Sequence, residues 1–140
     1  MKISIPDNIG SDLRVLPVGL AEAVIDQLFL GTSKTGNPKV TVRYVVTSEM
    51  KTEDDQAPTT VGENVLETYS LQPQALWRLN QVYKEVAGEN LPQGDYEEGV
   101  LEEMLNGTLK GTRWMLLLTT ELNQEGKEQT SIQEKKYLKD

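Results

Sequence analysis

Apolar and polar side chains alternate along five segments of this chain, and this alternation predicts five β-strands. In a strand, successive side chains point to opposite faces of the sheet, and β-branched and aromatic residues favour that setting. The clearest example is VTVRYVV, residues 40–46, in which Val40, Val42 and Tyr44 share one face while Thr41 and Arg43 share the other. The predicted strands cover residues 16–30, 39–48, 64–71, 109–122 and 128–138.

The first and fourth predicted strands supply much of the expected core. In the fourth strand, the most hydrophobic of the five, Trp114, Leu116 and Leu118 alternate on one face. In the first strand, strict alternation divides the side chains into two sets, and the second set, which contains more polar residues, is expected nearer solvent. The first set is Ala21, Ala23, Ile25 and Gln27, and the second is Glu22, Val24, Asp26 and Leu28.

Between the third and fourth predicted strands, the apolar spacing changes to three and four residues, which is typical of an amphipathic helix. We expect this helix to begin at Pro73, because proline favours a first turn, and to end at Gly88, because glycine readily adopts the left-handed conformation. A second helix is predicted from Asp95, with Glu98 as a variant capping box, to the pair at residues 106–107. The apolar stripe of the first helix is Leu76, Leu79, Tyr83 and Val86.

The order of these elements predicts a mainly β protein with two helices. Five short strands with a helical insertion between strands 3 and 4 match the OB-fold, a five-stranded Greek-key barrel, and a generic α+β sandwich is the alternative. At 140 residues the chain is expected to form a single domain, residues 1–140. Residues 1–15 are predicted to form an N-terminal arm, and residues 49–63 an acidic loop.

Composition argues against most catalytic chemistry. The chain contains no cysteine and no histidine, so it has neither a thiolate nucleophile nor the commonest general base and transition-metal ligand. A cluster of glutamates on the second helix could hold a hard metal ion, but a solvated helix face is the favoured interpretation. This cluster is Glu97, Glu98, Glu102 and Glu103. We therefore predict no enzymatic activity, no cofactor and no metal ion.

Residues 31–38, GTSKTGNP, join the first two predicted strands and are either a plain hairpin tip or a functional loop. They partly match the phosphate-binding pattern G-x-x-x-x-G-K-[ST], but Asn37 and Pro38 stand where lysine and a hydroxyl residue are needed. Proline also removes a backbone donor that a phosphate cradle requires. The sequence therefore argues against a nucleotide hydrolase.

The remaining candidate is a groove for single-stranded nucleic acid. In an OB-fold the ligand crosses strands 2 and 3 between two loops, which here are residues 31–38 and 123–129. Cations along this path would contact phosphates, and aromatic rings would stack on bases. Tyr44 alternates with the valines of its strand, which favours a core position for it, while the position of Tyr69 is left open. Trp77 is expected to cover a seam between helix and barrel. The candidate nucleic-acid-binding residues are Lys34, Lys39, Arg43, Tyr44, Tyr69, Arg113, Lys127, Lys135 and Tyr137.

Residues 31–38, followed by VTVRYV at residues 40–45, resemble a phage-encoded family of single-stranded DNA-binding proteins formerly described as a domain of unknown function. Leu105-Asn106-Gly107, a Glu-Gly-Lys loop and a last strand ending in Lys136-Tyr137 add to this resemblance, which covers residues 17–137. It implies an OB-fold and non-catalytic binding of single-stranded DNA during phage DNA replication or recombination. Many such proteins end in an acidic tail, whereas this chain ends in EKKYLKD.

Partners and location follow from the same pattern. The resemblance implies single-stranded DNA as ligand and phage or host replication and recombination proteins as further partners, in the host-cell cytoplasm. The longest apolar run, residues 114–118, is too short to span a bilayer, so no membrane association is predicted. A net charge of −8 argues against coating duplex DNA and favours an alternative, an OB-like protein-interaction or assembly module without nucleic-acid binding. The oligomeric state stays open, a homo-oligomer included.

Overall fold

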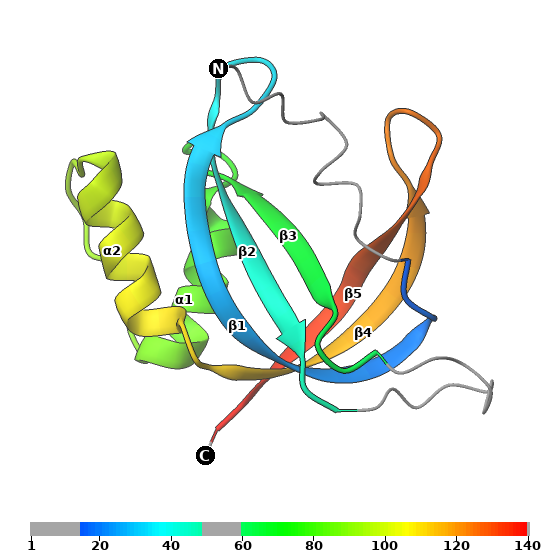
Figure 1. Cartoon of the computed structure of the whole chain (residues 1–140). Helices are drawn as coiled ribbons and strands as arrows, with labels where there is room; N and C mark the ends of the chain where they lie inside the picture. Colours follow the sequence, from blue (N-terminus) through cyan, green and yellow to red (C-terminus); the bar gives the residue numbers. More distant parts are fainter. Residues whose placement is uncertain (1–14, 49–59, 140) are drawn as a thin grey trace, which may run out of the picture.

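The computed structural model describes residues 15–48 and 60–139 (Figure 1). Almost all of the predicted N-terminal arm and most of the predicted acidic loop therefore lie outside the described residues. The elements are β1 (Gly19–Thr32), β2 (Pro38–Val46), β3 (Asn64–Ser70), α1 (Leu76–Ala87), α2 (Glu98–Leu109), β4 (Arg113–Leu122) and β5 (Glu128–Leu138). All five predicted strands and both predicted helices are present in the predicted order.

The strands form one antiparallel sheet in the order β3-β2-β1-β4-β5. β1 lies at the centre and pairs with β2 on one side and with β4 on the other. The sheet curves so that its edge strands β3 and β5 come into contact, with α1 and α2 beside it (Figure 1). Among the described residues no backbone ladder joins β3 to β5, so the sheet is open. The mainly β class with a helical insertion is confirmed, whereas a closed barrel is not shown.

The core fills the concave face of the sheet and is covered by the two helices. Its largest fully buried side chains are Trp114 and Tyr44. The predicted faces of β2 and β4 are confirmed by the buried Val40, Val42, Leu116 and Leu118, whereas Leu122 at the end of β4 is 69% exposed. In α1, Leu79 and Tyr83 are buried as predicted, whereas Leu76 at its first turn is exposed. The core is thus built mainly from β1, β2 and β4.

A β-bulge changes the alternation of β1 part-way along the strand. Ile25 pairs with Tyr44, but Gln27 pairs with Arg43, so Asp26 is an extra residue without a partner on β2. A bulge reverses the inward and outward positions that follow it. Leu28 is therefore buried and Phe29 is exposed, and the predicted placement of Gln27 with the core residues and of Leu28 on the solvent side was wrong.

Helix α2 covers the edge of β1 that β4 leaves unpaired. The pairing between β1 and β4 ends at Val24. Beyond it, the Asn106 side chain accepts a hydrogen bond from Leu28 N–H (2.9 Å) and donates one to Leu28 C=O (3.1 Å). Glu102 Oε2 accepts a bond from Leu30 N–H (2.9 Å). Two helix side chains thus satisfy backbone groups that a sheet edge would otherwise expose.

The starts of both helices and the end of α2 differ from the predicted boundaries. α1 begins at Leu76 rather than Pro73, and its predicted end is confirmed by Gly88 with φ = 79°. α2 begins at Glu98 and continues through residues 106–107 to Leu109, because Asn106 docks on β1 instead of ending the helix. β4 consequently begins later than predicted. Both helices of the described chain are 12 residues long, and neither is long and apolar enough to cross a membrane.

Candidate nucleic-acid interface

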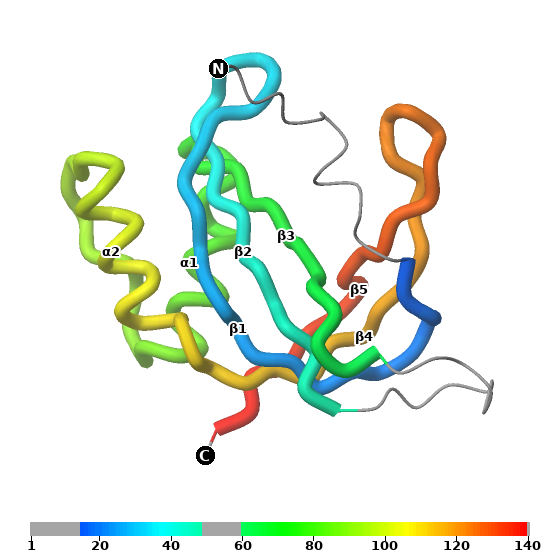
Figure 2. Tube along the Cα trace, viewed as in Figure 1, coloured from blue at the N-terminus to red at the C-terminus, as the bar shows by residue number. Residues whose placement is uncertain are grey.

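The β1–β2 and β4–β5 connections are two copies of one tight turn. Gly36 N–H donates to Ser33 C=O (2.9 Å), and Gly126 N–H donates to Asn123 C=O (2.9 Å). Both glycines have positive φ, 85° and 78°, a conformation that other residues adopt at a cost. The turns comprise residues 33–37 and 123–127, shorter than the predicted loops, and both rise from the same end of the sheet (Figure 2).

Side chains brace each turn and leave its lysine pointing outward. Ser33 Oγ accepts a bond from Asn37 N–H (3.1 Å), and Asn123 Oδ1 accepts bonds from the backbone N–H groups at 125 (2.9 Å) and 127 (3.0 Å). Lys34 and Lys127 are exposed. Within residues 15–48 and 60–139, neither lysine has a carboxylate at ion-pair distance. The turns are therefore ordered supports for two unpaired positive charges.

The convex surface of the first three strands carries an aromatic ring that the sequence analysis missed. Phe29 is 36% exposed, and Arg43 Cζ lies 5.1 Å from its ring centroid. Arg43 also donates through Nε to Asp26 Oδ2 (2.8 Å). We call this surface the β1–β3 outer face. Its residues are Phe29, Lys39, Thr41, Arg43, Leu66, Thr68 and Ser70.

Strand register places these side chains in rows across the β1–β3 outer face. Phe29 pairs with Thr41, and Thr41 pairs with Thr68. One row along, Lys39 pairs with Ser70. A ring, two hydroxyls and a lysine thus lie side by side, and the turn carrying Lys34 continues from the same hairpin. The sequence holds one signal for the exposure of Phe29. Leu28 and Leu30 can both face the core together with Ile25 only if β1 contains one extra residue, and that places Phe29 on the outer face.

Tyr44 and Tyr69 lie in the core rather than on a surface. Their exposed fractions are 0% and 2%, which confirms the core alternative for Tyr44. Both hydroxyls donate to Glu67 Oε1. Burial raises the pKa of both tyrosines above the ordinary value, and the negative charge of Glu67 adds to the shift. Neither ring offers a face on which a base could stack.

Lys135 and Tyr137 also face the interior of the sheet. Lys135 Nζ lies 3.1 Å from Glu67 Oε2 and 5.2 Å from the Tyr69 ring centroid. Tyr137 is partly buried and packs against Trp114, with ring centroids 5.3 Å apart. The Lys135 charge is therefore compensated by a carboxylate and links β5 to β3 by a side-chain ion pair.

The candidate residues consequently fall into separate groups. Lys34, Lys39 and Arg43 belong to the β1–β2 hairpin, and Arg43 lies against the Phe29 ring. Lys127 lies in the second turn, whereas Arg113 lies on the outer face of β1 and β4 and pairs with Glu22 (3.1 Å). The inward-facing group consists of Tyr44, Tyr69, Lys135 and Tyr137. The candidate nucleic-acid-binding surface is thus reduced to the β1–β2 hairpin and the β4–β5 turn.

The helix glutamates do not share one role. Glu102 is hydrogen-bonded to β1, whereas Glu97, Glu98 and Glu103 are exposed, as a solvated face would be. Within the described ranges, no group of three or more acidic residues is arranged to hold a metal ion.

Comparison with protein families and curated proteins does not identify a family for this chain. No protein-family model matches this chain, and no curated protein matches it. Its function is therefore inferred from the arrangement of side chains on the sheet.

Proposed function

We propose that this protein is a non-catalytic, sequence-tolerant single-stranded DNA-binding protein. The observation that carries the proposal is the β1–β3 outer face, where the exposed Phe29 ring lies beside Lys39 and below the Lys34 turn. Proteins that bind single strands without sequence preference combine cations along the backbone path with aromatic rings that stack on bases. A hydroxyl row from Thr41 to Thr68 supplies further hydrogen-bond donors for phosphate or sugar oxygens.

An OB-fold is part of the proposal. The strand order β3-β2-β1-β4-β5, with the helices inserted between β3 and β4, supports a partly open five-stranded Greek-key barrel. At the gap between β3 and β5, the pair of Lys135 with Glu67 stands where a backbone ladder would close the barrel. In that fold, β2, β3 and the two turns border the ligand, which agrees with the position of the β1–β3 outer face.

The biological setting follows from the sequence resemblance. A protein of this kind would protect transient single strands during phage DNA replication or recombination in the host cytoplasm. Phage or host replication and recombination proteins would be its partners. With a net charge of −8, DNA would be bound by a local group of cations and not by the overall charge of the protein. Such local binding is compatible with the net charge because charges beyond roughly 8 Å are screened at physiological salt.

The test is fluorescence anisotropy of labelled oligo-dT over a series of salt concentrations. We expect the logarithm of the binding constant to fall linearly with the logarithm of salt, with a slope of about −0.7 per phosphate contacted. Phe29→Ala should weaken binding by about 1–3 kcal/mol, the usual contribution of one stacked base. Lys34→Glu and Lys39→Glu should weaken binding and make the slope shallower.

Lys110→Glu is the matched control, because Lys110 is exposed at the end of α2 and is not a residue of the β1–β3 outer face. It makes the same charge change and should leave the binding curve close to that of the wild type. Absence of binding to oligo-dT at low salt would contradict the proposed function. Equal weakening by the control would show a general charge effect instead of a site.

A protein-interaction or assembly module is the second candidate, and exposed apolar residues favour it. Val18 and Leu122 are 60% and 69% exposed, and Leu20 is 45% exposed opposite Leu117. Such residues often mark protein contacts when they form a patch. Failure to bind oligonucleotides together with a stable, folded protein would support this candidate.

A further inference from the structure

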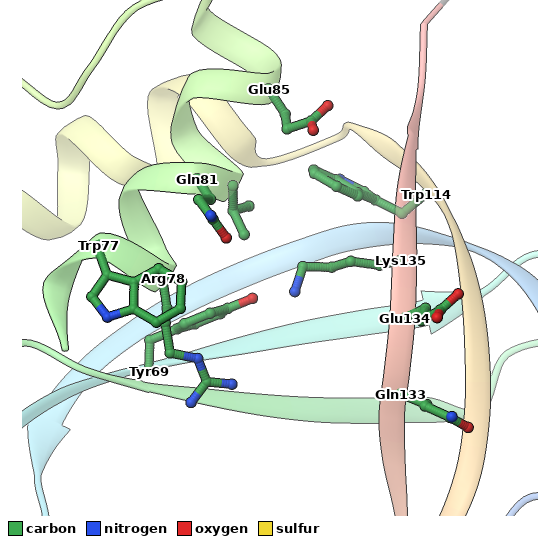
Figure 3. A pocket seen from close by; sticks show the side chains of 10 residues that line it. Tyr69, Trp77, Arg78, Gln81, Glu85, Trp114, Gln133, Glu134 and Lys135 are labelled. Carbon is green, nitrogen blue, oxygen red and sulfur yellow. The ribbon is translucent and has the colours of Figure 1, made fainter.

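A cavity of about 410 Å³ lies at the gap between β3 and β5, beside α1 (Figure 3). We call it the seam cavity. Tyr69 of β3, Trp77, Arg78 and Glu85 of α1, Trp114 of β4 and Lys135 of β5 contribute to its lining. Its volume lies within the range of sites that hold small molecules or single nucleotides. The cavity is separate from the β1–β3 outer face, because Tyr69 and Lys135 belong to the opposite face of the sheet.

The two tryptophans of the chain both line this cavity, in different settings. Trp114 is 1% exposed and its indole N–H donates to Thr112 Oγ1 (2.9 Å), so it is a wall of the core. Trp77 is 58% exposed and lies at one end of the cavity (Figure 3). Trp77 was predicted to cover a seam between helix and barrel, whereas the structure places it at the cavity beside α1 with most of its side chain exposed. An indole face is thus available for stacking.

Charge is distributed unevenly around the seam cavity. Arg78 lies next to Trp77, with its Cζ 5.9 Å from the Tyr69 ring centroid. Within the described residues, no carboxylate lies at ion-pair distance from Arg78. The two lining carboxylates, Glu85 near Trp114 and Glu134 on β5, lie away from Trp77 (Figure 3), and the Lys135 charge is held by Glu67. An anionic group would therefore be attracted to Arg78 and repelled from the Glu85 end.

The seam cavity is close in sequence and register to the β1–β3 outer face. Lys39 pairs with Ser70, the last residue of β3. Only residues 71–75 separate Ser70 from α1, whose second residue is Trp77. Tyr69, the residue before Ser70, has Arg78 Cζ 5.9 Å from its ring centroid, so a strand that crosses the edge of β3 beside Lys39 would meet the Arg78 end of the cavity.

We propose that the seam cavity is a second nucleotide subsite of the bound strand. One nucleotide beyond those on the β1–β3 outer face stacks its base on Trp77 and places a phosphate at Arg78. A stacked base and a charge-assisted bond from arginine to phosphate are the two contacts that this pair of side chains can supply together. The inference rests on the proposed function and deepens it by adding a contact on the other side of β3.

The test is a titration of the full chain with labelled oligo-dT, followed both by anisotropy of the label and by intrinsic tryptophan fluorescence. Stacking on Trp77 should quench the fluorescence in parallel with the rise in anisotropy. Trp77→Ala should weaken binding roughly tenfold to a hundredfold, as expected for one stacked base. Trp77→Phe keeps a ring and should restore most of the affinity, and Arg78→Gln should reduce the salt slope by about 0.7.

Leu76→Ala is the matched control, because Leu76 is the exposed neighbour of Trp77 on α1 and does not line the cavity. It should bind like the wild type. A rise in anisotropy with unchanged tryptophan fluorescence, and with equal affinity for Trp77→Ala and Leu76→Ala, overturns the second subsite and leaves the proposed function intact. No rise in anisotropy with wild-type protein overturns both.

Discussion

Glu67 is the residue on which the polar part of the core depends. One carboxylate oxygen accepts bonds from the hydroxyls of Tyr44 and Tyr69, and the other pairs with Lys135. Buried polar groups are stable only when each has a partner, and here four groups satisfy one another. Glu67 and Tyr69 share a face because they are two residues apart in β3, but alternation could not show that Tyr44 and Lys135 reach the same carboxylate from other strands.

This arrangement predicts loss of stability at alkaline pH. Burial and the Glu67 charge raise the pKa of Tyr44 and Tyr69 in the folded state above the unfolded value of about 10. Above that pH the unfolded chain releases protons that the folded chain keeps, so the free energy of unfolding decreases as pH rises. Below pH of about 10 the contribution is fully present. Urea unfolding at a series of alkaline pH values measures the decrease.

The same prediction has a spectroscopic form. Of the five tyrosines, Tyr44 and Tyr69 should resist ionisation in the near-ultraviolet absorbance titration until the protein unfolds. The double variant Tyr44→Phe/Tyr69→Phe removes both hydroxyls and should show a flatter decline of stability above pH of about 10. Reversible ionisation of all tyrosines in a protein that keeps its native circular dichroism would contradict the prediction.

At the scale of elements, the pairing of α2 with β1 decides how the helical insertion is attached. The central strand changes its partner along its length: it pairs with β4 up to Val24 and is bonded by α2 beyond the bulge. Asn106 reproduces both hydrogen bonds that a neighbouring strand would make with Leu28. The pair at residues 106–107 predicted a helix end, because asparagine and glycine are common there; the tertiary contact to β1 outweighed this local preference.

Removing the Asn106 amide should therefore destabilise the protein. Asn106→Ala leaves Leu28 N–H and C=O without this partner, and we expect a loss of about 1–3 kcal/mol in the free energy of unfolding. Glu103→Ala is the matched control, because Glu103 is an exposed α2 residue, and it should cost less than about 0.5 kcal/mol. Urea unfolding followed by circular dichroism measures both, and equal stability of the two variants would contradict the docking role.

At the scale of the whole molecule, a side-chain contact rather than a backbone ladder joins the two edges of the described sheet. Lys135 and Glu67 side chains are only 21% and 14% exposed, so their pairing is shielded from solvent more than a surface ion pair. The seam that they bridge also borders the seam cavity, which Lys135 lines. The seam cavity therefore lies at the place where the sheet is open, between β3 and β5.

A double-mutant cycle tests this bridge. Glu67→Gln and Lys135→Met should each destabilise the protein by about 1–3 kcal/mol, because each leaves a shielded charge without its partner. The double variant should lose less than the sum of the two single losses, with a coupling of about 0.5–3 kcal/mol. Urea unfolding of all four proteins measures the coupling. Strictly additive losses would show that the pair does not join β3 to β5.

Much of the fold was predictable because it depends on local patterns. The element types, their order and the end of β5 follow from periodicity and from turn residues, and Gly88 and Gly126 occupy positions where left-handed backbone is needed. The candidate site was predictable only in part. Lys34, Lys39 and Arg43 were found from their place on a hairpin, whereas Phe29 was missed because a single bulge at Asp26 reverses the faces of β1.

The sequence by itself determined the strands and the helices, since these depend on residue type and on spacing along the chain. Only the tertiary structure decided which side chains meet. It turned Lys135 inward to Glu67, placed Phe29 beside Arg43, and brought Trp77 to the gap between β3 and β5. The physical reason is that strand register, a bulge and the curvature of the sheet set distances between residues far apart in sequence, and no local pattern encodes those distances.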